Sequence, residues 1–280
     1  MALLEVIGAT VKFGGITAVN EASIDVEGGT ITGLIGPNGA GKTTLFNVIT
    51  GLQPPTRGRV RFKNHDVTKS SVSHRAKMGM GRTFQRLEAF GSLTVRENIH
   101  AARDIHGGFW RSLRMHRDPR VDELIETVGL ERYAHNRADS VPTGVARLLE
   151  VARALAIEPD LLLLDEPSSG LDEAETHALG ELLRQLADDG RAILMVEHDM
   201  DLVMGACDLI HVLEFGKVIK TGTADEVRND RAVQAAYLGF SDADAADIPP
   251  EVADQASEIL GTPAQFQHTA PIPAIRTEGQ

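Results

Sequence analysis

The chain has 280 residues, of which 42% are hydrophobic and 24% charged, as is ordinary for a globular protein with one large domain or two modest ones. A single cysteine, Cys207, excludes an internal disulfide, and no apolar run reaches the about 18 residues that a membrane-spanning helix needs. The net charge of −12 argues against a nucleic-acid partner held by phosphate contacts.

The first 50 residues predict strands that lead into a glycine-rich loop and a helix. Strand-like segments cover 4–11, 16–26 and 30–35, and glycine pairs separate them. Residues 36–43 read G-P-N-G-A-G-K-T and fit the phosphate-binding pattern G-x-x-x-x-G-K-[ST]. Apolar residues follow this loop with helical spacing, so the motif lies between a strand and a helix, as its function requires.

The residue types of this loop suit a triphosphate. Its glycines let successive amide N–H groups face one anion, and the helix that begins near Lys42 adds the positive end of its dipole. Lys42 supplies a cation for the outer phosphates, and the Thr43 hydroxyl is placed for Mg²⁺. We therefore predict that the protein binds a nucleoside triphosphate through Gly36, Asn38, Gly39, Ala40, Gly41, Lys42, Thr43 and Thr44.

The rest of the body alternates strands and helices around a helical insertion. A turn at 54–58 and a strand region at 60–67 precede helical periods, and these cover 94–103, 121–128 and 145–156. Strands at 161–164, 192–196, 209–213 and 217–221 then follow, with a helix at 173–188. The run 161–164 is short and wholly apolar, which indicates a buried parallel strand. The pattern predicts an α/β fold with a mostly helical insertion around 85–155.

Polar residues follow the predicted buried strands. Asp165 and Glu166 end the strand at 161–164, at the edge where ligands bind in open α/β sheets. Asp165 would hold Mg²⁺, directly or through water, and Glu166 would act as the general base for an attacking water. His198 follows the next strand and would steady that water or the terminal phosphate. A histidine after a strand is by itself more often structural, so this role rests on its position one strand beyond Asp165 and Glu166. Gln85 would complete Mg²⁺ coordination or orient the water.

The residues after 240 differ in composition from the body. They include seven acidic residues against one base, Arg276, and five of the twelve prolines. A short helix over 251–260 is compatible with the sequence, but the remainder lacks the apolar residues needed to order itself. We expect 241–280 to be a disordered acidic tail, or else a docking or regulatory segment.

Taken together, these motifs resemble the nucleotide-binding subunit of an ATP-binding cassette (ABC) transporter. The match covers about residues 3–240 and rests on the loop at 36–43, Gln85, a signature-like region at 141–150, the segment 161–172 and His198. Four passages further resemble the branch that serves uptake of branched-chain, hydrophobic amino acids: F-G-G-I-T-A-V-N at 13–20, R-T-F-Q at 82–85, V-E-H-D-M-D at 196–201 and A-Y-L-G at 236–239.

The resemblance implies a fold, a reaction and site residues. The fold would be a P-loop NTPase core with an antiparallel β subdomain and a helical subdomain at about 86–155, together forming an ATPase domain at 1–240. The protein would hydrolyse ATP with Mg²⁺. Phe13 would stack on adenine, Gln85 would touch Mg²⁺ and sense the membrane subunit, and Asp172 would contact the opposing protomer.

The resemblance also implies partners and a location. Two ATPase subunits, identical or different, would enclose two ATP molecules, each between one phosphate loop and the other subunit's signature segment. They would drive transmembrane permease subunits and, indirectly, serve a solute-binding protein. The start of the chain lacks a secretion signal, so we expect a cytoplasmic protein held peripherally on the inner face of the cell membrane.

The signature region departs from the family's usual Leu-Ser-Gly-Gly-Gln, since residues 141–145 read V-P-T-G-V. Pro142 suits the first turn of a helix, and Gly144 permits close backbone approach. Our hypothesis is that the Thr143 hydroxyl substitutes for the missing serine. The alternative is a weak signature that makes one composite ATP site slow.

Two other functions remain open from the sequence. An ABC subunit that serves another solute, such as urea or an amide, or that serves export would keep the same chemistry. A non-transport ABC ATPase acting on ribosomes or DNA is disfavoured, because the chain has one cassette, no repeat and no sustained heptads.

Overall fold

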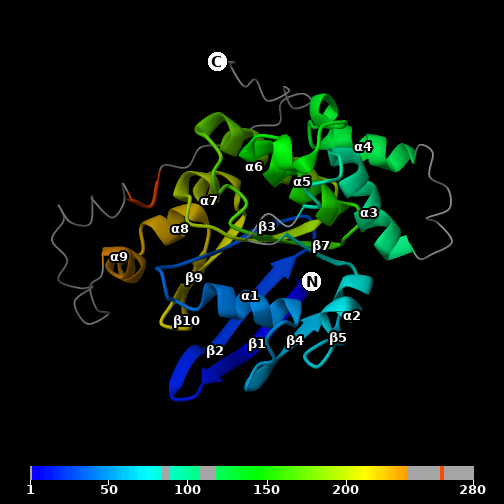
Figure 1. Cartoon of the computed structure of the whole chain (residues 1–280). Coiled ribbons are helices and arrows are strands. Elements are labelled where there is room, and N and C mark those ends of the chain that lie inside the picture. Colours follow the sequence, from blue (N-terminus) through cyan, green and yellow to red (C-terminus); the bar gives the residue numbers. More distant parts are fainter. Residues whose placement is uncertain (1, 84–88, 108–117, 239–258, 262–280) are drawn as a thin grey trace.

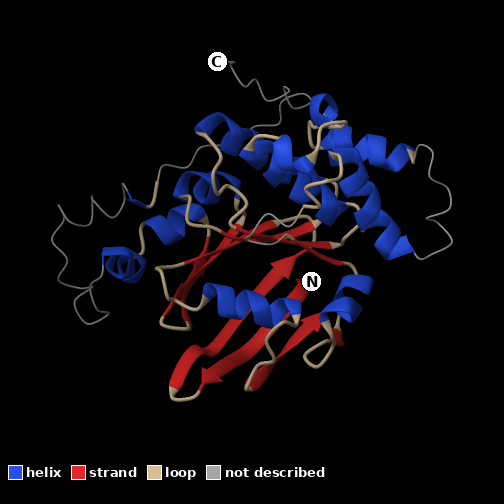
Figure 2. Ribbon diagram, in the orientation of Figure 1, coloured by secondary structure: helices blue, strands red, loops and turns tan. Residues whose placement is uncertain are grey.

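The computed structural model describes residues 2–83, 89–107, 118–238 and 259–261. It contains two β-sheets, with one layer of helices above the larger sheet and one helix between the two sheets (Figures 1 and 2). This arrangement confirms the predicted α/β class.

The smaller sheet is antiparallel and forms early in the chain. Its strands, in the order β2-β1-β4-β5, are β2 (Ile16–Glu27), β1 (Ala2–Phe13), β4 (Arg57–Phe62) and β5 (His65–Asp66). From Ala22 to Glu27, buried and exposed residues alternate along β2, as expected of a strand with one covered face. The hairpin between β1 and β2 ends with Phe13 opposite Ile16.

The larger sheet is mostly parallel. Its order is β10 (Lys217–Gly222), β9 (Leu209–Glu214), β3 (Ile31–Ile35), β8 (Ala192–Val196), β7 (Leu161–Asp165) and β6 (Met80–Arg82). Every residue of β3, β7 and β8 is buried, and β7 pairs in parallel with both β6 and β8. This confirms the buried parallel strand predicted from 161–164.

The larger sheet packs on both faces. Leu161 and Leu163 of β7 belong to a core shared with α1 (Lys42–Thr50) and the smaller sheet. Leu162 and Leu164 face the opposite way, into a core shared with the helices above the sheet. The buried side chains of α1 therefore fix the helix that follows the phosphate loop between the two sheets.

Arg75 holds the C-terminal end of α1. It belongs to α2 (Val72–Lys77) and is only 1% exposed. Its guanidinium donates to the carbonyl oxygens of Val48, at 2.7 Å, and of Ile49. Since the last carbonyls of a helix lack partners within it, this arginine acts as a side-chain cap.

The described parts of the segment between β6 and β7 are mostly helical, as predicted. Its α-helices are α3 (Val95–Gly107), α4 (Pro119–Thr127) and α5 (Thr143–Leu155), with short 3₁₀ turns at Glu131–Tyr133 and Ala138–Ser140. Gly129, with φ at 71°, follows the end of α4 and makes the predicted break.

The remaining helices lie between and after the last strands. They are α6 (Glu173–Asp188), α7 (Met200–Ala206), α8 (Ala224–Arg228) and α9 (Arg231–Leu238). From the region after 240, the structure describes only 259–261. There Leu260 is fully buried in the same core as Met200 and Leu202 of α7. Within the described ranges, no helix combines the length and apolarity needed to cross a bilayer.

Candidate nucleotide-binding site

The phosphate loop connects β3 to α1, and two of its glycines are required by close backbone contacts. A Cβ on Gly36 would lie 2.0 Å from the carbonyl oxygen of Leu213, and one on Gly41 would lie 2.3 Å from that of Ala18. Gly41, with φ at 105°, is also the residue before α1, and no side chain caps the helix there. The start of α1 is therefore available to an external anion.

The loop is held from the side opposite its exposed tip. The amide of Gly216, in the turn between β9 and β10, donates to the carbonyl oxygen of Ala40 at 2.8 Å. The buried Ala40 thus anchors the loop, whereas Asn38, Gly39 and Thr43 are exposed and Thr44 is half-buried. The exposed residues are the ones placed to meet a ligand.

Lys42 lies over the loop. Its ammonium donates to the carbonyl oxygens of Gly36 and, at 3.1 Å, of Pro37. Burial lowers the pKa of Lys42, and the nearby negative charge of Glu166 raises it in part. A half-buried cation next to the uncapped amides at the start of α1 favours the binding of an anion such as a phosphate.

Asp165 ends β7 and is buried, with its side chain 4% exposed. Burial raises the pKa of its carboxyl, the positive charge of Arg82 lowers it, and Glu166 raises it again. The guanidinium of Arg82 donates to its Oδ2 at 3.3 Å. This carboxylate is therefore held by a cation from the neighbouring strand β6.

Glu166 follows Asp165 with φ at 50°, in the left-handed region that a side chain other than glycine rarely adopts. Its amide donates to the carbonyl oxygen of Val196 at 2.9 Å, which links the ends of β7 and β8. Backbone strain of this kind persists where the surroundings impose it, and it is concentrated at functional sites.

His198 stands beside Glu166. Its Nδ1 is 3.9 Å from Oε1 of Glu166 and 3.9 Å from Oε2 of Glu197, and its side chain is 64% exposed. The ring is thus close to the predicted base and accessible to a bound ligand. The structure brings Lys42, Asp165, Glu166 and His198 together at one edge of the larger sheet.

Glu197 is a residue that sequence reasoning missed. Its buried carboxylate accepts from the amide of Ser168 at 2.7 Å through Oε1, and from that of His198 at 3.0 Å through Oε2. It therefore ties the loop that carries His198 to the loop after Glu166. The sequence offered one signal for it: Glu197 is a charged residue directly after a wholly apolar strand. A charged side chain that is buried at such a position must find hydrogen-bond partners.

The signature-like residues form a second group with the loop before α6. A Cβ on Gly144 would lie 2.3 Å from Oε1 of Glu175, and Thr143 Cγ2 lies 3.1 Å from the position of a Cβ on Gly170. Asp172 caps α6 by accepting from the amide of Glu175 at 2.8 Å, and Glu175 in return accepts from the amide of Asp172.

Pro142 does not lie in the first turn of α5. The helix begins at Thr143, and Pro142 precedes it with an extended ψ of 157° and no side-chain cap. The prediction placed this proline one residue too far into the helix. The residue before the helix is where a serine hydroxyl would normally cap the first amides, and proline offers no such group.

Phe13 and Gln85 complete the predicted set. Phe13 is 49% exposed at the end of the β1–β2 hairpin, and Ala18 of the same hairpin touches the loop at Gly41. Its ring is accessible to a base, which is compatible with adenine stacking. Stacking by Phe13 stays a prediction. Gln85 lies outside the described residues.

The oxygen donors near the loop fit Mg²⁺. The carboxylate of Asp165 and the hydroxyl of Thr43 are hard ligands, and Mg²⁺ binds proteins through one or two carboxylates together with substrate phosphates. Among the described residues, no group of three or more His, Cys, Asp or Glu side chains is arranged to hold a metal ion by itself. This donor set suits a metal that arrives with a nucleotide.

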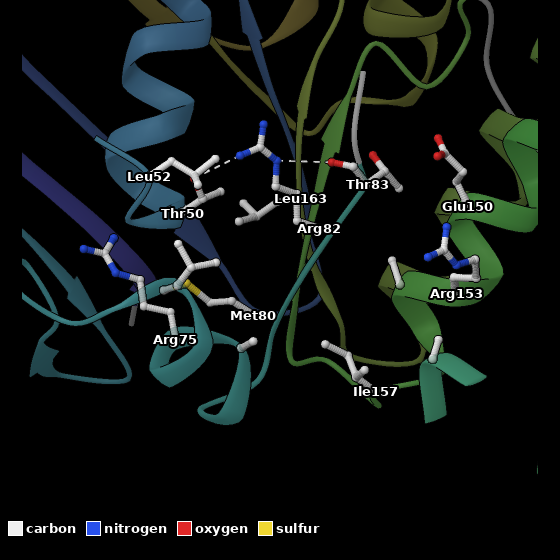
Figure 3. Close-up of a pocket in the computed structure, with 14 residues that line it drawn as sticks. Thr50, Leu52, Arg75, Met80, Arg82, Thr83, Glu150, Arg153, Ile157 and Leu163 are labelled. Atoms are coloured by element: carbon white, nitrogen blue, oxygen red, sulfur yellow. Dashed lines mark hydrogen bonds between the residues drawn. The ribbon is translucent and has the colours of Figure 1, made fainter. Parts of the chain in front are cut away.

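A groove of about 260 Å³ runs beside the site, between α1, α2, β6 and α5 (Figure 3). Apolar side chains form much of its wall, namely Leu52, Val72, Met80, Ile157 and Leu163. Leu52 and Val72 are 53% and 41% exposed at its rim. Arg82 reaches into the groove between Thr50 and Thr83, as the close-up shows.

Sequence comparisons agree with this geometry. The family model for the ABC transporter matches residues 19–169, and a model for the branched-chain amino acid ATP-binding cassette transporter matches residues 217–239. The chain is 39% identical to the high-affinity branched-chain amino acid transport ATP-binding protein LivG of Salmonella typhimurium, over 85% of the chain and 98% of that protein. It is 36% identical to BraF of Pseudomonas aeruginosa, a protein with the same description, over the same shares.

Solved structures give the same result. The chain is similar to the ADP conformation of MJ1267, an ATP-binding cassette of an ABC transporter, with a TM-score of 0.77, 30% identity and coverage of 85% of this chain and 99% of that one. It is also similar to a nucleotide-free ATP-binding cassette from an ABC transporter, with a TM-score of 0.73, 28% identity and coverage of 91% and 98%. The chain therefore belongs to the family of ABC transporter ATP-binding proteins.

Proposed function

We propose that this ABC ATPase is the subunit that powers an importer of branched-chain or similar hydrophobic amino acids. The observation that carries the chemical part is the convergence of Lys42, Asp165, Glu166 and His198 at one sheet edge. The observation that supports the choice of solute is the match of residues 217–239 to the family model for the branched-chain amino acid ATP-binding cassette transporter.

The chain's own groups bind the triphosphate at the phosphate loop. Amides at the start of α1 and the ammonium of Lys42 hold the β- and γ-phosphates, and Phe13 offers a ring to the adenine. Thr43 and Asp165 would hold Mg²⁺, with Gln85 as a further ligand. When bound, Mg²⁺ neutralises charge on the phosphates.

Hydrolysis then needs a base and a group that positions the water. Glu166 accepts a proton from the attacking water, whose oxygen bonds to the γ-phosphorus while the bond to the β–γ bridging oxygen breaks. His198, 3.9 Å from Glu166, donates a hydrogen bond to the γ-phosphate and keeps the water in line. The products are ADP and inorganic phosphate, with no phosphate transferred to the cargo.

The groove beside β6 suits a cytoplasmic segment of a transmembrane permease subunit. Its rim exposes Leu52 and Val72 and much of its wall is apolar, so the apolar face of an amphipathic segment is the complementary occupant. Binding there would hold the ATPase peripherally on the inner face of the membrane. A solute-binding protein would deliver the amino acid on the opposite face.

A second ATPase subunit would complete the assembly. Asp172 and Gly144 both lie against Glu175, and Thr143 lies beside Gly170, so these residues form one group of the kind that a surface meeting the partner's ATP would require. Our hypothesis is that the Thr143 hydroxyl contacts that γ-phosphate. Thr143→Ala in the assembled transporter is expected to slow ATP hydrolysis. An unchanged rate would contradict this hypothesis and favour the alternative, in which the signature is weak and this subunit pairs with a different ATPase subunit, so that one composite ATP site is slow.

Glu166→Gln tests the chemical part. Gln has nearly the same shape but cannot accept the proton, so the variant is expected to bind ATP, lose turnover and accumulate as an ATP-bound dimer. The matched control is Glu126→Gln on the exposed face of α4, which should hydrolyse ATP like the parent. Full turnover by Glu166→Gln in size-exclusion and phosphate-release assays would remove Glu166 from this role.

One observation favours a second cargo class. The chain is 34% identical to the lipopolysaccharide export system ATP-binding protein LptB of Haemophilus influenzae, over 79% of the chain and 90% of that protein. The two cargoes are distinguished by reconstituting the transporter in vesicles and measuring uptake of radioactive leucine. ATP-dependent leucine uptake supports the importer, and its absence with an intact ATPase would direct attention to other solutes.

A further inference from the structure

Arg82 makes an unusual set of contacts next to the proposed metal site. It ends β6, and its side chain is 15% exposed. Its guanidinium donates to Oδ2 of Asp165 at 3.3 Å, to Oδ1 of Asn47 at 3.2 Å and to Oγ1 of Thr50 at 3.1 Å. The same group lies over the ring of Phe46, with its central carbon 4.9 Å from the ring centre.

These contacts join two parts of the site that are far apart in sequence. Phe46, Asn47 and Thr50 belong to α1, the helix that follows the phosphate loop, whereas Asp165 ends β7. The planar guanidinium, with its fixed directions of donation, therefore sets the position of the Asp165 carboxylate relative to α1. A lysine at 82 would carry the charge but not this geometry.

Arg82 and a metal ion can share Asp165. A carboxylate has acceptor sites on both oxygens, so a bond from Arg82 to Oδ2 is compatible with a metal or a metal-bound water on the same group. Residues that orient a metal ligand without touching the metal typically change metal affinity about 10–100-fold when they are replaced.

We propose that Arg82 is a positioning residue for Mg²⁺ binding, acting through Asp165 and anchored on α1. This inference rests on the proposed function, because it assumes that Asp165 meets Mg²⁺ together with ATP. Arg82 also connects the groove to the proposed metal site, because it lines the groove wall and contacts Asp165 (Figure 3).

The test compares ATP affinity with and without the metal. The dissociation constant for ATP is measured by equilibrium titration of the full chain, once with EDTA and once with excess Mg²⁺, and the ratio of the two constants reports the metal's contribution. In Arg82→Gln this ratio is expected to fall about 10-fold or more, while the constant measured in EDTA stays unchanged. Arg82→Lys should recover only part of the ratio.

The matched control is Arg61→Gln, which breaks an ion pair with Glu5 in the smaller sheet, away from the phosphate loop. It should leave the ratio unchanged. Three results overturn the inference: a parental ratio in Arg82→Gln, an equal loss of ATP affinity in both conditions, or full recovery by lysine. A lower melting temperature with a parental ratio would assign Arg82 to stability alone.

A second variant keeps the test decisive if Arg82→Gln does not fold. Asn47→Ala removes one anchor of the guanidinium and leaves Asp165 and Arg82 in place. A reduced ratio in this variant supports the inference, and an unchanged one overturns it. If the parent itself shows no effect of Mg²⁺ on ATP affinity, the proposed function fails at the metal site, which is a separate outcome.

Discussion

The left-handed backbone of Glu166 leads to a stability prediction that separates strain from chemistry. At φ of 50°, an L-residue pays about 1–2 kcal/mol that glycine does not pay. Glycine loses about 0.5–1 kcal/mol more conformational entropy on folding. The difference predicts that Glu166→Gly is more stable than Glu166→Ala by up to about 1.5 kcal/mol, although both variants lack the catalytic carboxylate.

The assay is urea unfolding of the nucleotide-free proteins, with thermal melting as a second readout. For a domain of this size, 1 kcal/mol corresponds to about 2–4 °C in melting temperature. The control pair is Glu123→Gly and Glu123→Ala, at an exposed position inside α4. There glycine is expected to be the less stable variant by about 0.5–1 kcal/mol, so the sign reverses.

The reasoning is refuted if glycine is less stable than alanine at both positions. Such a result would mean that the backbone at 166 is not strained in the folded protein. Agreement at both positions would show that the left-handed backbone at Glu166 lowers the stability of the folded protein, as expected where a functional side chain must be held in one orientation.

Three further predictions concern the loop, the pH dependence and the chain end. Gly36→Ala should lose ATP binding and more stability than Gly39→Ala, because a Cβ at 36 would lie 2.0 Å from the carbonyl oxygen of Leu213. Gly39→Ala has no atom within 4 Å of its Cβ and should lose only about 1–2 kcal/mol, so equal stability losses in urea titrations would contradict this prediction. Burial lowers the pKa of His211, so this histidine contributes stability that is present above pH 6.5 and is lost as the pH falls. His211→Gln should therefore lose less stability than the parent between pH 7 and pH 5 in urea titrations, and parallel curves would be the contrary result. Leu260 is fully buried against α7, so Leu260→Ala should cost about 2–5 kcal/mol in the full chain, and a loss below 0.5 kcal/mol would show that this contact contributes little.

Local chemistry made several elements predictable. The helix at 173–188 has the predicted bounds because Asp172 and Glu175 form a capping box whose spacing is visible in the sequence. The strand at 161–164 was readable because its four consecutive leucines are too few for a helix and too continuous for a half-exposed strand. The phosphate loop was readable because its glycines have separate physical reasons: close backbone contacts at Gly36 and Gly41, and a positive φ of 81° at Gly39.

The parts that sequence reasoning missed depend on contacts between distant residues. Arg82 and Asp165 are 83 positions apart, and no local pattern shows that they meet. The cap of α1 by Arg75 and the two loops joined by Glu197 depend in the same way on how the sheet brings its strand ends together. Helices α7, α8 and α9 are short, so their few turns give a weak periodic signal.

The most direct test of the account is the affinity of the purified chain for ATP in the presence of Mg²⁺, measured for the parent and for Lys42→Met. The account predicts Mg²⁺-dependent binding by the parent and its loss in the variant, because the ammonium over the phosphate loop is the cation that meets the outer phosphates. A parent that folds but shows no Mg²⁺-dependent affinity for ATP would contradict it.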